Sequence, residues 1–206
     1  MPFDAFIFDF DGTLVDSAPA KYEAFFAVFP GTARHREVVE QVLAKDPDGS
    51  RYTVIPRMLE RFRELQLTLS EGSVAGAYIE AYGHAVLEAV TRCPEIPGAT
   101  RILQAVHKLG RPAFISSNTP FDPLRVSVER RGWLPLTNGI YGYPSRKADT
   151  ARLILEETAV PPARLAVIGD GISDADSAKA VGATFFRISQ PADLLAHARS
   201  WGLNHV

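Results

Sequence analysis

The sequence predicts an α/β fold, with a doubly wound, Rossmann-like parallel sheet as its core and an α-helical domain inserted into that core. Three observations support this prediction. Five short runs are apolar without alternation, which is typical of strands covered on both faces. From about Pro97 onward these runs alternate with helical patterns, as in doubly wound sheets. The block between the first run and the second, about 80 residues long, shows helical patterns and no convincing strand.

The elements of the core follow from these patterns. The expected strands are Ala5–Phe8, Pro112–Ser116, Gly139–Tyr143, Leu165–Gly169 and Thr184–Ile188. In the segment 98–110 the apolar residues share one helical stripe, and Gly110 is a C-terminal stop. A second helix, around Leu124 and Val128, is expected to end in the same way at Gly132. Two further helices are expected over 147–157 and 173–182.

The block from 16 to 95 is too large to be a simple crossover connection. Apolar residues recur at helical spacing in its last segment, for which Ser70 is a candidate N-cap. We therefore expect an inserted helical domain over 16–95, with the core formed by 1–15 and 96–206. The helical segments expected within it are 21–29, 36–45, 56–65 and 70–90.

Composition limits the classes of function. The formal net charge of −2 offers no basic surface for nucleic acid and no attraction to an anionic membrane. No apolar run is long enough to span a bilayer, and the N-terminus lacks the features of a signal peptide. Cys93 is the only cysteine, which excludes an internal disulfide and cysteine-based metal sites. A cytoplasmic protein is expected.

Polar residues follow the expected strands at their carboxyl ends, where α/β sheets bind ligands. The first strand is followed by two acids, the second by a Ser-Ser-Asn run, and the fourth by two more acids. A lysine lies in the loop beyond the third strand. In chain order these residues are Asp9, Asp11, Ser116, Ser117, Asn118, Lys147, Asp170 and Asp174.

The four acids need a cation if the topology brings them together. At about 4 Å and an effective dielectric constant near 20, each pair of carboxylates repels by roughly 4 kcal/mol. Carboxylates without histidine or cysteine suit a hard ion, most simply Mg²⁺. A metal ion, a lysine, and hydroxyl and amide donors together suit a phosphoryl dianion.

These residues carry a resemblance to a known family. The stretch Asp9-Phe10-Asp11-Gly12-Thr13 resembles the first motif, DxDGT, of the haloacid dehalogenase (HAD) superfamily. Ser117-Asn118 resembles its second motif, Lys147 its third, and "GDGISD", with Asp170 and Asp174, its fourth. The helical insert resembles the C1 cap of the phosphoglycolate phosphatase and β-phosphoglucomutase branch. The resemblance covers essentially the whole chain, with the motifs in the family's order.

The resemblance implies a role for each matching residue. Asp9 would be the nucleophile that forms an aspartyl-phosphate, and Asp11 the general acid and base. Mg²⁺ would be held by Asp9, the backbone carbonyl of Asp11 and Asp170, with Asp174 as a further contact. Ser117, Asn118 and Lys147 would bind the phosphoryl group.

For the second and third motifs, an adjacent residue in the sequence is an alternative to the residue that we assign. A proline often follows the motif-three lysine in this branch, whereas this chain has Ala148, and Arg146 stands next to Lys147. We prefer Lys147. The register of the second motif also leaves Ser116 as an alternative to Ser117, and we prefer Ser117 because it adjoins Asn118.

Other polar and aromatic residues have simpler interpretations. Asp174 and Asp176 begin an expected helix, which acids stabilise and Ser173 could cap; for Asp176 this is the preferred interpretation. Tyr78 and Tyr82 are expected in the core of the insert. Arg51 and Tyr52 are expected in a solvated loop, with Arg51 as a possible determinant of substrate specificity.

The expected function is that of a Mg²⁺-dependent phosphatase acting on a small phosphomonoester. A phosphomutase like β-phosphoglucomutase is the first alternative. A 2-haloacid dehalogenase is disfavoured by Asp11, and a catalytically silent binding protein by the retention of every motif residue. The expected partner is a small phosphorylated metabolite, and the chain is expected to be a monomer or small homo-oligomer. The sequence leaves the substrate open.

Overall fold

The computed structural model describes residues 2–46, 49–69 and 74–203, and the chain divides into two compact units. The first, here called the core unit, comprises Met1–Ser17 and Cys93–Val206. The second, the helical unit, comprises Ala18–Arg92 and is inserted between the two parts of the core unit. The predicted fold class, a doubly wound parallel sheet with an inserted helical domain, is confirmed.

The core unit contains a five-stranded parallel sheet in the order β3-β2-β1-β4-β5. Its strands are β1 Ala5–Phe8, β2 Ala113–Pro120, β3 Gly139–Tyr143, β4 Leu165–Gly169 and β5 Thr184–Arg187. Two strands have bounds that differ from the sequence expectation: β5 ends at Arg187 rather than Ile188, and β2 runs from Ala113 to Pro120 rather than from Pro112 to Ser116. Its register against β3 shifts between Ser116 and Pro120, so the polar residues after Ser116 still lie in a strand, though an irregular one.

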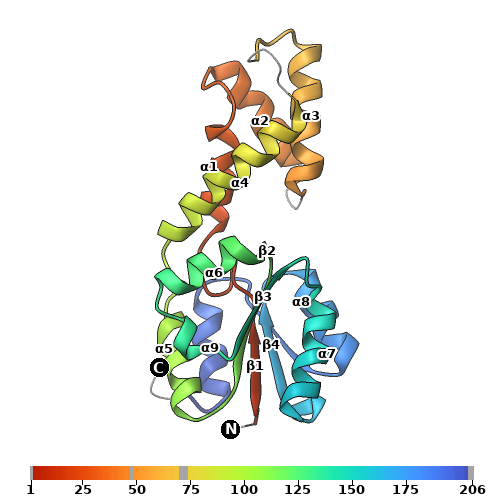
Figure 1. Cartoon of the computed structure of the whole chain (residues 1–206). Coiled ribbons are helices and arrows are strands. Elements are labelled where there is room, and N and C mark those ends of the chain that lie inside the picture. Colours follow the sequence, from red (N-terminus) through yellow and green to blue (C-terminus); the bar gives the residue numbers. More distant parts are fainter. Residues whose placement is uncertain (1, 47–48, 70–73, 204–206) are drawn as a thin grey trace. The chain divides into compact units, whose positions relative to one another are not determined.

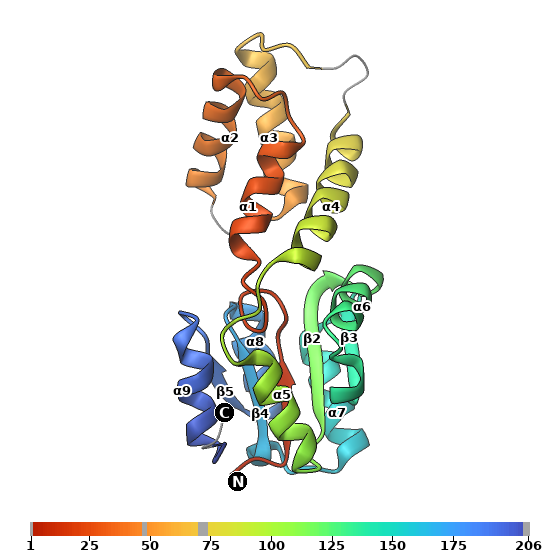
Figure 2. The same cartoon turned by 90° about the vertical axis from the view of Figure 1, so that its left-hand side faces the viewer.

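Helices cover both faces of the sheet (Figures 1 and 2). α5 and α9 lie on one face, and α7 and α8 on the other. The alternation of side chains along β1 explains why the strand is apolar throughout. Phe6 and Phe8 pack against Trp201 beyond the end of α9, whereas Ile7 packs in a cluster with Ile154 and Ala178. The core helices are α5 Ala99–Lys108, α6 Phe121–Arg130, α7 Lys147–Thr158, α8 Ile172–Val181 and α9 Ala192–Ser200.

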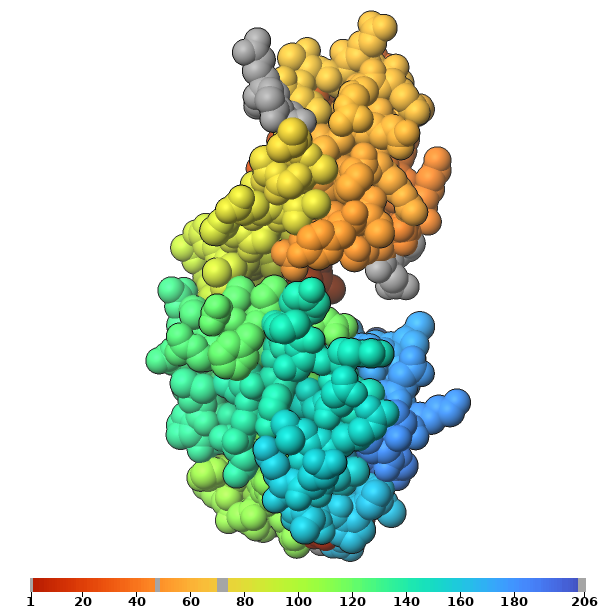
Figure 3. All heavy atoms as spheres, turned by 45° about the vertical axis from the view of Figure 1, so that its right-hand side comes forward, coloured from red at the N-terminus to blue at the C-terminus, as the bar shows by residue number. Residues whose placement is uncertain are grey.

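Two of these helices differ from the sequence expectation. Helix α9 was not expected, although Leu194 and Ala198 are fully buried and hold it against the core. In α5, Leu109 is about half exposed and lies just past the helix, so it does not belong to the buried stripe. In the space-filling view, atoms of the segment from α6 to α7, coloured green to cyan, form much of the facing surface of the core unit (Figure 3).

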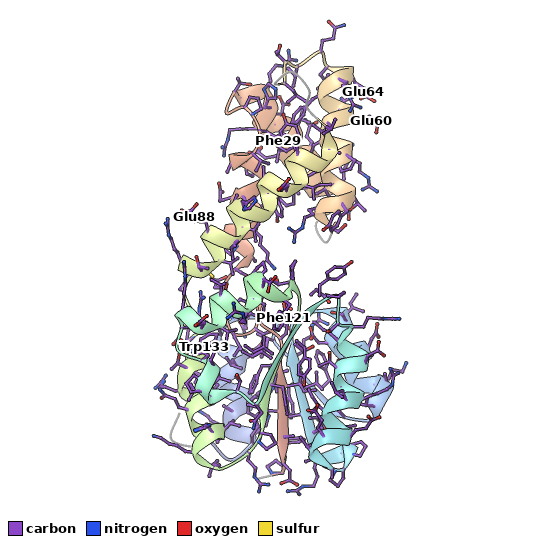
Figure 4. All side chains as sticks on the ribbon, viewed as in Figure 1. Phe29, Glu60, Glu64, Glu88, Phe121 and Trp133 are labelled. Atoms are coloured by element: carbon purple, nitrogen blue, oxygen red, sulfur yellow. The ribbon has the colours of Figure 1, made fainter. Side chains whose placement is uncertain are left out.

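The helical unit is a bundle with its own apolar core. Its helices are α1 Ala18–Ala27, α2 Ala33–Lys45, α3 Arg51–Glu64 and α4 Ala75–Arg92. Phe25 stacks on Tyr82 at 4.1 Å, and Phe29 stacks on Tyr78 at 4.8 Å between ring centroids. Figure 4 labels Phe29 within this unit. The two tyrosines therefore belong to this core, as expected. The candidate N-cap Ser70 lies outside the described residues.

The chain leaves the core unit and returns to it through two adjacent segments. The N–H of Asp16 donates to the carbonyl oxygen of Pro94 at 3.0 Å, and the N–H of Ile96 donates to that of Leu14 at 2.9 Å. Val15 forms an antiparallel bridge with Glu95. The outgoing and returning segments therefore form a short paired ribbon.

Within the described part of the chain, no helix combines the length and the apolar character needed to cross a membrane.

Candidate active site

Asp9 follows β1 directly and is buried at the carboxyl end of the central strand. Its N–H donates to the carbonyl oxygen of Ile168 at 2.8 Å, which extends the pairing of β1 with β4 by one step. The next side chain, Phe10, is fully buried and meets Trp133 edge to face at 6.3 Å between ring centroids (Figure 4 labels Trp133). Phe10 therefore anchors the strand end in the apolar core, while the flanking acids remain at the sheet edge.

Lys147 is brought to Asp9 by the start of α7. Its ammonium nitrogen lies 2.9 Å from Asp9 Oδ1 and 2.7 Å from Asp174 Oδ1, and all three side chains are buried. The helix expected over 147–157 is observed as α7, so Lys147 is the first residue of a helix and not part of the loop before it. Its neighbour Arg146 is exposed and precedes the helix. Of the two basic candidates, it is Lys147 that the structure joins to the acids.

The two acids after β4 join the same cluster. Carboxylate oxygens of Asp9, Asp170 and Asp174 can all lie within 4.8 Å of one another. Asp174 lies in the first turn of α8, where its Oδ2 accepts a hydrogen bond from the N–H of Gly171 at 3.3 Å. Asp170 is exposed, unlike the other two. Three carboxylates at this separation offer the hard oxygen ligands that Mg²⁺ prefers.

The helix start was expected to be capped by Ser173, which is wrong. Helix α8 begins at Ile172 after Gly171, and Ser173 lies inside its first turn. The hydroxyl of Ser173 instead accepts a hydrogen bond from Asn118 Nδ2 at 3.3 Å. Asp176, on the same helix, is exposed and does not belong to the acidic cluster.

Glycine gives the acids room to approach. Gly12 has φ +73°, and a Cβ there would lie 2.2 Å from Asp170 Oδ2. A Cβ at Gly169 would lie 2.2 Å from the carboxyl carbon of Asp174. Both distances are far below van der Waals contact, so the cluster requires glycine at these two positions.

Burial opposes ionisation of Asp9 and Asp174. It raises the pKa of the Asp9 carboxyl to about 8, against the opposing effect of the Lys147 ammonium, and the nearby carboxylate of Asp174 adds to the rise. Burial also raises the pKa of Asp174, again opposed by Lys147. Burial alone would lower the pKa of Lys147, but its two carboxylate partners outweigh burial and raise it. The ammonium is therefore held in its charged form between the acids.

Asp11 lies apart from this cluster and contacts hydroxyl groups. Ser17 Oγ donates to its Oδ1 at 2.7 Å, and Thr119 Oγ1 donates to its Oδ2 at 2.6 Å. Ser117 Oγ also reaches Oδ2, at 3.4 Å. Sequence reasoning missed Ser17 and Thr119. The period of two along β2 is the signal that could have found Thr119, because it shares a side of the strand with Ser117.

The serine and asparagine of the second motif point to different partners. Ser117 is buried and contacts Asp11, whereas Asn118 is exposed and bonds to Ser173. Ser116, the alternative to Ser117, is buried in the regular part of β2, paired with Tyr141. Of the two serines, Ser117 is the one with a hydrogen bond to Asp11.

Arg51 belongs to the helical unit and lies in a helix, so the expected solvated loop is wrong. It is the first residue of α3, and Tyr52 is the second. The Arg51 guanidinium lies over the Tyr82 ring at 5.4 Å and over the Tyr52 ring at 5.8 Å. Stacking on aromatic rings fixes this side chain within its own unit.

Known proteins are similar to this chain over most of its length. Residues 3–182 match the family model of the haloacid dehalogenase-like hydrolases. A phosphoglycolate phosphatase of Rhodobacter capsulatus is 26% identical over 205 residues, which cover 94% of this chain and 90% of the relative. A phosphoglycolate phosphatase of Psychrobacter arcticus is 26% identical over 181 residues, covering 82% of this chain and 75% of the relative.

Solved structures show the same fold. A HAD family hydrolase of Deinococcus radiodurans, with bound phosphate and sodium, superposes with a TM-score of 0.66 at 22% identity, covering 95% of this chain and 88% of that one. A mutant of CbbY from Rhodobacter sphaeroides, in complex with xylulose-(1,5)bisphosphate, gives a TM-score of 0.60 at 17% identity, covering 89% of this chain and 84% of that one.

The fold and the acidic site thus define a hydrolase of the HAD class. The chain belongs to the haloacid dehalogenase-like hydrolase family, since the family model matches most of its length. The expectation of a HAD-family hydrolase is confirmed, and the two relatives described above are phosphoglycolate phosphatases.

Proposed function

We propose that this chain is a Mg²⁺-dependent phosphatase that hydrolyses a small phosphomonoester through an aspartyl-phosphate on Asp9. One observation carries the proposal. The Asp9 carboxylate and the Lys147 ammonium are buried in contact at the carboxyl end of the central strand, beside Asp170 and Asp174. A carboxylate can attack a phosphoryl group as a nucleophile, and a fixed cation beside it can stabilise the negative charge of the phosphoryl oxygens.

The donor set fits a magnesium ion. The cluster offers carboxylate oxygens from Asp9, Asp170 and Asp174, and the backbone carbonyl of Asp11 is the further ligand that the family resemblance implies. Asp9 and Asp174 both contact the single ammonium group of Lys147, so one positive charge faces two carboxyl groups. Bound Mg²⁺ would supply positive charge that offsets the oxygens of the substrate phosphoryl group.

The chain's own residues then carry two steps. In the first, an Asp9 carboxylate oxygen attacks phosphorus, the bond from phosphorus to the leaving oxygen breaks, and Asp11 gives that oxygen a proton. In the second, Asp11 takes a proton from water, the water oxygen bonds to phosphorus, and the Asp9–phosphorus bond breaks to release phosphate. Ser117, Asn118 and Lys147 bind the phosphoryl oxygens during both steps.

The substrate is a small phosphorylated metabolite, and phosphoglycolate is the first to test because the curated relatives are phosphoglycolate phosphatases. The helical unit serves as a cap that selects the substrate, with Arg51 as a specificity residue. A cytoplasmic location and a monomeric or small homo-oligomeric state complete the proposal.

The test is phosphate release from 4-nitrophenyl phosphate and from a panel of metabolites, with and without Mg²⁺. Wild-type protein should release phosphate only with the ion, and Asp9→Asn should be inactive. Asp176→Asn is the matched control, since it removes an exposed acid that lies outside the cluster. Equal activity of wild type and Asp9→Asn, or no activity on any substrate, would contradict the proposal. An isomerised sugar phosphate in place of free phosphate would instead establish a phosphomutase.

A further inference from the structure

The Asp11 carboxylate receives a hydroxyl donor on each oxygen. Ser17 Oγ lies 2.7 Å from Oδ1, and Thr119 Oγ1 lies 2.6 Å from Oδ2. The 2.6 Å separation is within the range of strong hydroxyl–carboxylate hydrogen bonds, about 2.5–2.7 Å. Ser117, at 3.4 Å from the same Oδ2, makes a much longer contact. Thr119 is therefore the main donor from β2 to Asp11.

The alternation of side chains along β2 directs Thr119 toward Asp11. Successive side chains of a strand alternate, so Ser117 and Thr119 share one side while Asn118 points to the other. The hydrogen bonds agree, because Ser117 and Thr119 both reach Asp11 whereas Asn118 reaches Ser173. The N–H of Thr119 also donates to Ser117 Oγ at 3.1 Å. Thr119 thus touches both the expected proton carrier and the expected phosphate-binding serine.

We propose that Thr119 is a positioning residue that holds the Asp11 carboxyl group in the orientation from which it serves the leaving oxygen. This inference rests on the proposed phosphatase function. The β-branched side chain of threonine restricts χ1, so its hydroxyl is a fixed donor. A carboxyl group retains acceptor capacity whether it is ionised or protonated. The same contact can therefore persist while Asp11 gives and takes a proton.

The variants for the test separate the hydroxyl from the shape of the side chain. Thr119→Val keeps the branched shape and removes the donor, whereas Thr119→Ser keeps the donor. Thr137→Val is the matched control, since the Thr137 hydroxyl bonds only to the backbone carbonyls of Trp133 and Leu134 among the contacts described. Two substrates of similar size differ in their need for an acid: phenyl phosphate has a basic leaving group, and 4-nitrophenyl phosphate has a weakly basic one.

Loss of acid positioning should depend on the leaving group. For Thr119→Val, kcat/KM on phenyl phosphate should fall about tenfold and kcat/KM on 4-nitrophenyl phosphate by about twofold at most, because kcat/KM reports the first step and general acid catalysis matters less there for a good leaving group. Thr119→Ser and Thr137→Val should remain within about twofold of wild type. Equal losses on both substrates, or no loss on either, would overturn the proposal.

A crystal structure of Thr119→Val gives a readout that needs no activity. Asp11 should occupy more than one rotamer in the variant and a single rotamer in the wild-type protein. An unchanged single rotamer in a folded variant would also overturn the proposal. Failure of the wild-type enzyme to release phosphate would count against the phosphatase function, while the rotamer comparison would still decide the role of Thr119.

Discussion

Asp170 leaves no space for a side chain at Gly12. A Cβ at that position would lie 2.2 Å from Asp170 Oδ2, and the backbone there has φ +73°. Two separate requirements therefore meet at one residue: a left-handed turn after β1 and the close approach of an acid from the end of β4. A substitution at Gly12 affects both the backbone turn and the position of Asp170. Gly132 has a left-handed backbone but open space around it, so a substitution there affects the backbone alone.

Gly12→Ala should lower Mg²⁺-dependent activity about tenfold or more, because displacement of Asp170 misplaces one carboxylate of the cluster. Gly132→Ala is the matched control, since Gly132 has φ +69° but nothing within 4 Å of its Cβ position. Both variants should lose about 1–2 kcal/mol of stability from the left-handed backbone. The measurements are activity against Mg²⁺ concentration and urea unfolding. Equal activity of the two variants would show that the contact with Asp170 is unimportant.

Lys147→Met should destabilise the metal-free protein by about 3 kcal/mol, because removal of one partner leaves buried acids without their counter-charge. Lys147 contacts both Asp9 and Asp174, and all three side chains are buried. The measurement is the free energy of unfolding in urea with a chelator present. Arg146→Met, at the exposed neighbouring position, should change this free energy by less than about 0.5 kcal/mol. Similar values for the two variants would argue against a buried ion pair.

Mg²⁺ should raise the melting temperature of the wild-type protein. An ion that binds only the folded state, at a concentration 100 times its Kd, stabilises by about 2.7 kcal/mol. Asp170→Asn should abolish most of the rise, since Asp170 is one of the three clustered acids. Asp176→Asn should keep it. Thermal unfolding with and without the ion checks this independently of activity, and a full rise in Asp170→Asn would exclude Asp170 as a ligand.

Asp4→Asn should reduce stability near neutral pH and have little effect in acid. Asp4 precedes β1 and pairs with Arg164 and Arg111, and the hydrogen bond from Arg164 holds the pKa of Asp4 below its ordinary value of 3.8. A lowered folded-state pKa gives stability that is complete above the ordinary value and is lost as pH falls through the lowered one.

Urea unfolding from pH 7 to pH 2 measures this effect. The gap in unfolding free energy between wild type and Asp4→Asn should close on the acid side of pH 3.8, the ordinary pKa of the group. A gap that stayed constant over the whole range would mean that the carboxylate charge of Asp4 contributes nothing.

Arg51→Gln should raise KM for the preferred substrate about tenfold, which corresponds to about 1.4 kcal/mol, if Arg51 binds an anionic group of that substrate. For 4-nitrophenyl phosphate, which lacks a second anionic group, KM should not change. Arg57→Gln is a control in the same helix, at a residue paired with Asp46. A KM that is unchanged for every metabolite tested would argue that Arg51 only stacks on Tyr82 and Tyr52 and does not bind substrate.

The regular part of the fold could be predicted because its signals are local. The runs 5–8, 139–143 and 165–169 match β1, β3 and β4 residue for residue. Their apolar side chains are continuous because helices cover both faces of the sheet. Helix α9 was not predicted from the sequence, although Leu194 and Ala198 form its buried face. A short helix with two fully buried positions gives a weak periodic signal.

The polar site was harder to predict, because its contacts join residues far apart in the chain. The motif residues could be placed at one sheet edge by topology, but Thr119 reaches Asp11 across 108 positions of sequence. Period-two alternation puts Thr119 on the same side of β2 as Ser117, but this local pattern does not show which distant side chain it contacts. The boundary at Ser116 was wrong because the register of β2 against β3 shifts there and the strand continues to Pro120. Arg51 was assigned to a loop because the preceding "DPDG" has turn composition, whereas α3 begins at Arg51, after Ser50 at the N-cap position.

The paired ribbon between residues 14–16 and 94–96 has a consequence for the evolution and engineering of the chain. Asp16 and Pro94 are hydrogen-bonded neighbours, so the exit and entry points of the insertion lie side by side. A tight hairpin could join them without moving any strand of the sheet. Inserted segments of different length and shape can therefore be joined at this point without a change in the sheet. Exchange of the segment Ala18–Arg92 would therefore replace the helical unit while the acids at the sheet edge, and the Ser17 donor to Asp11, keep their sequence.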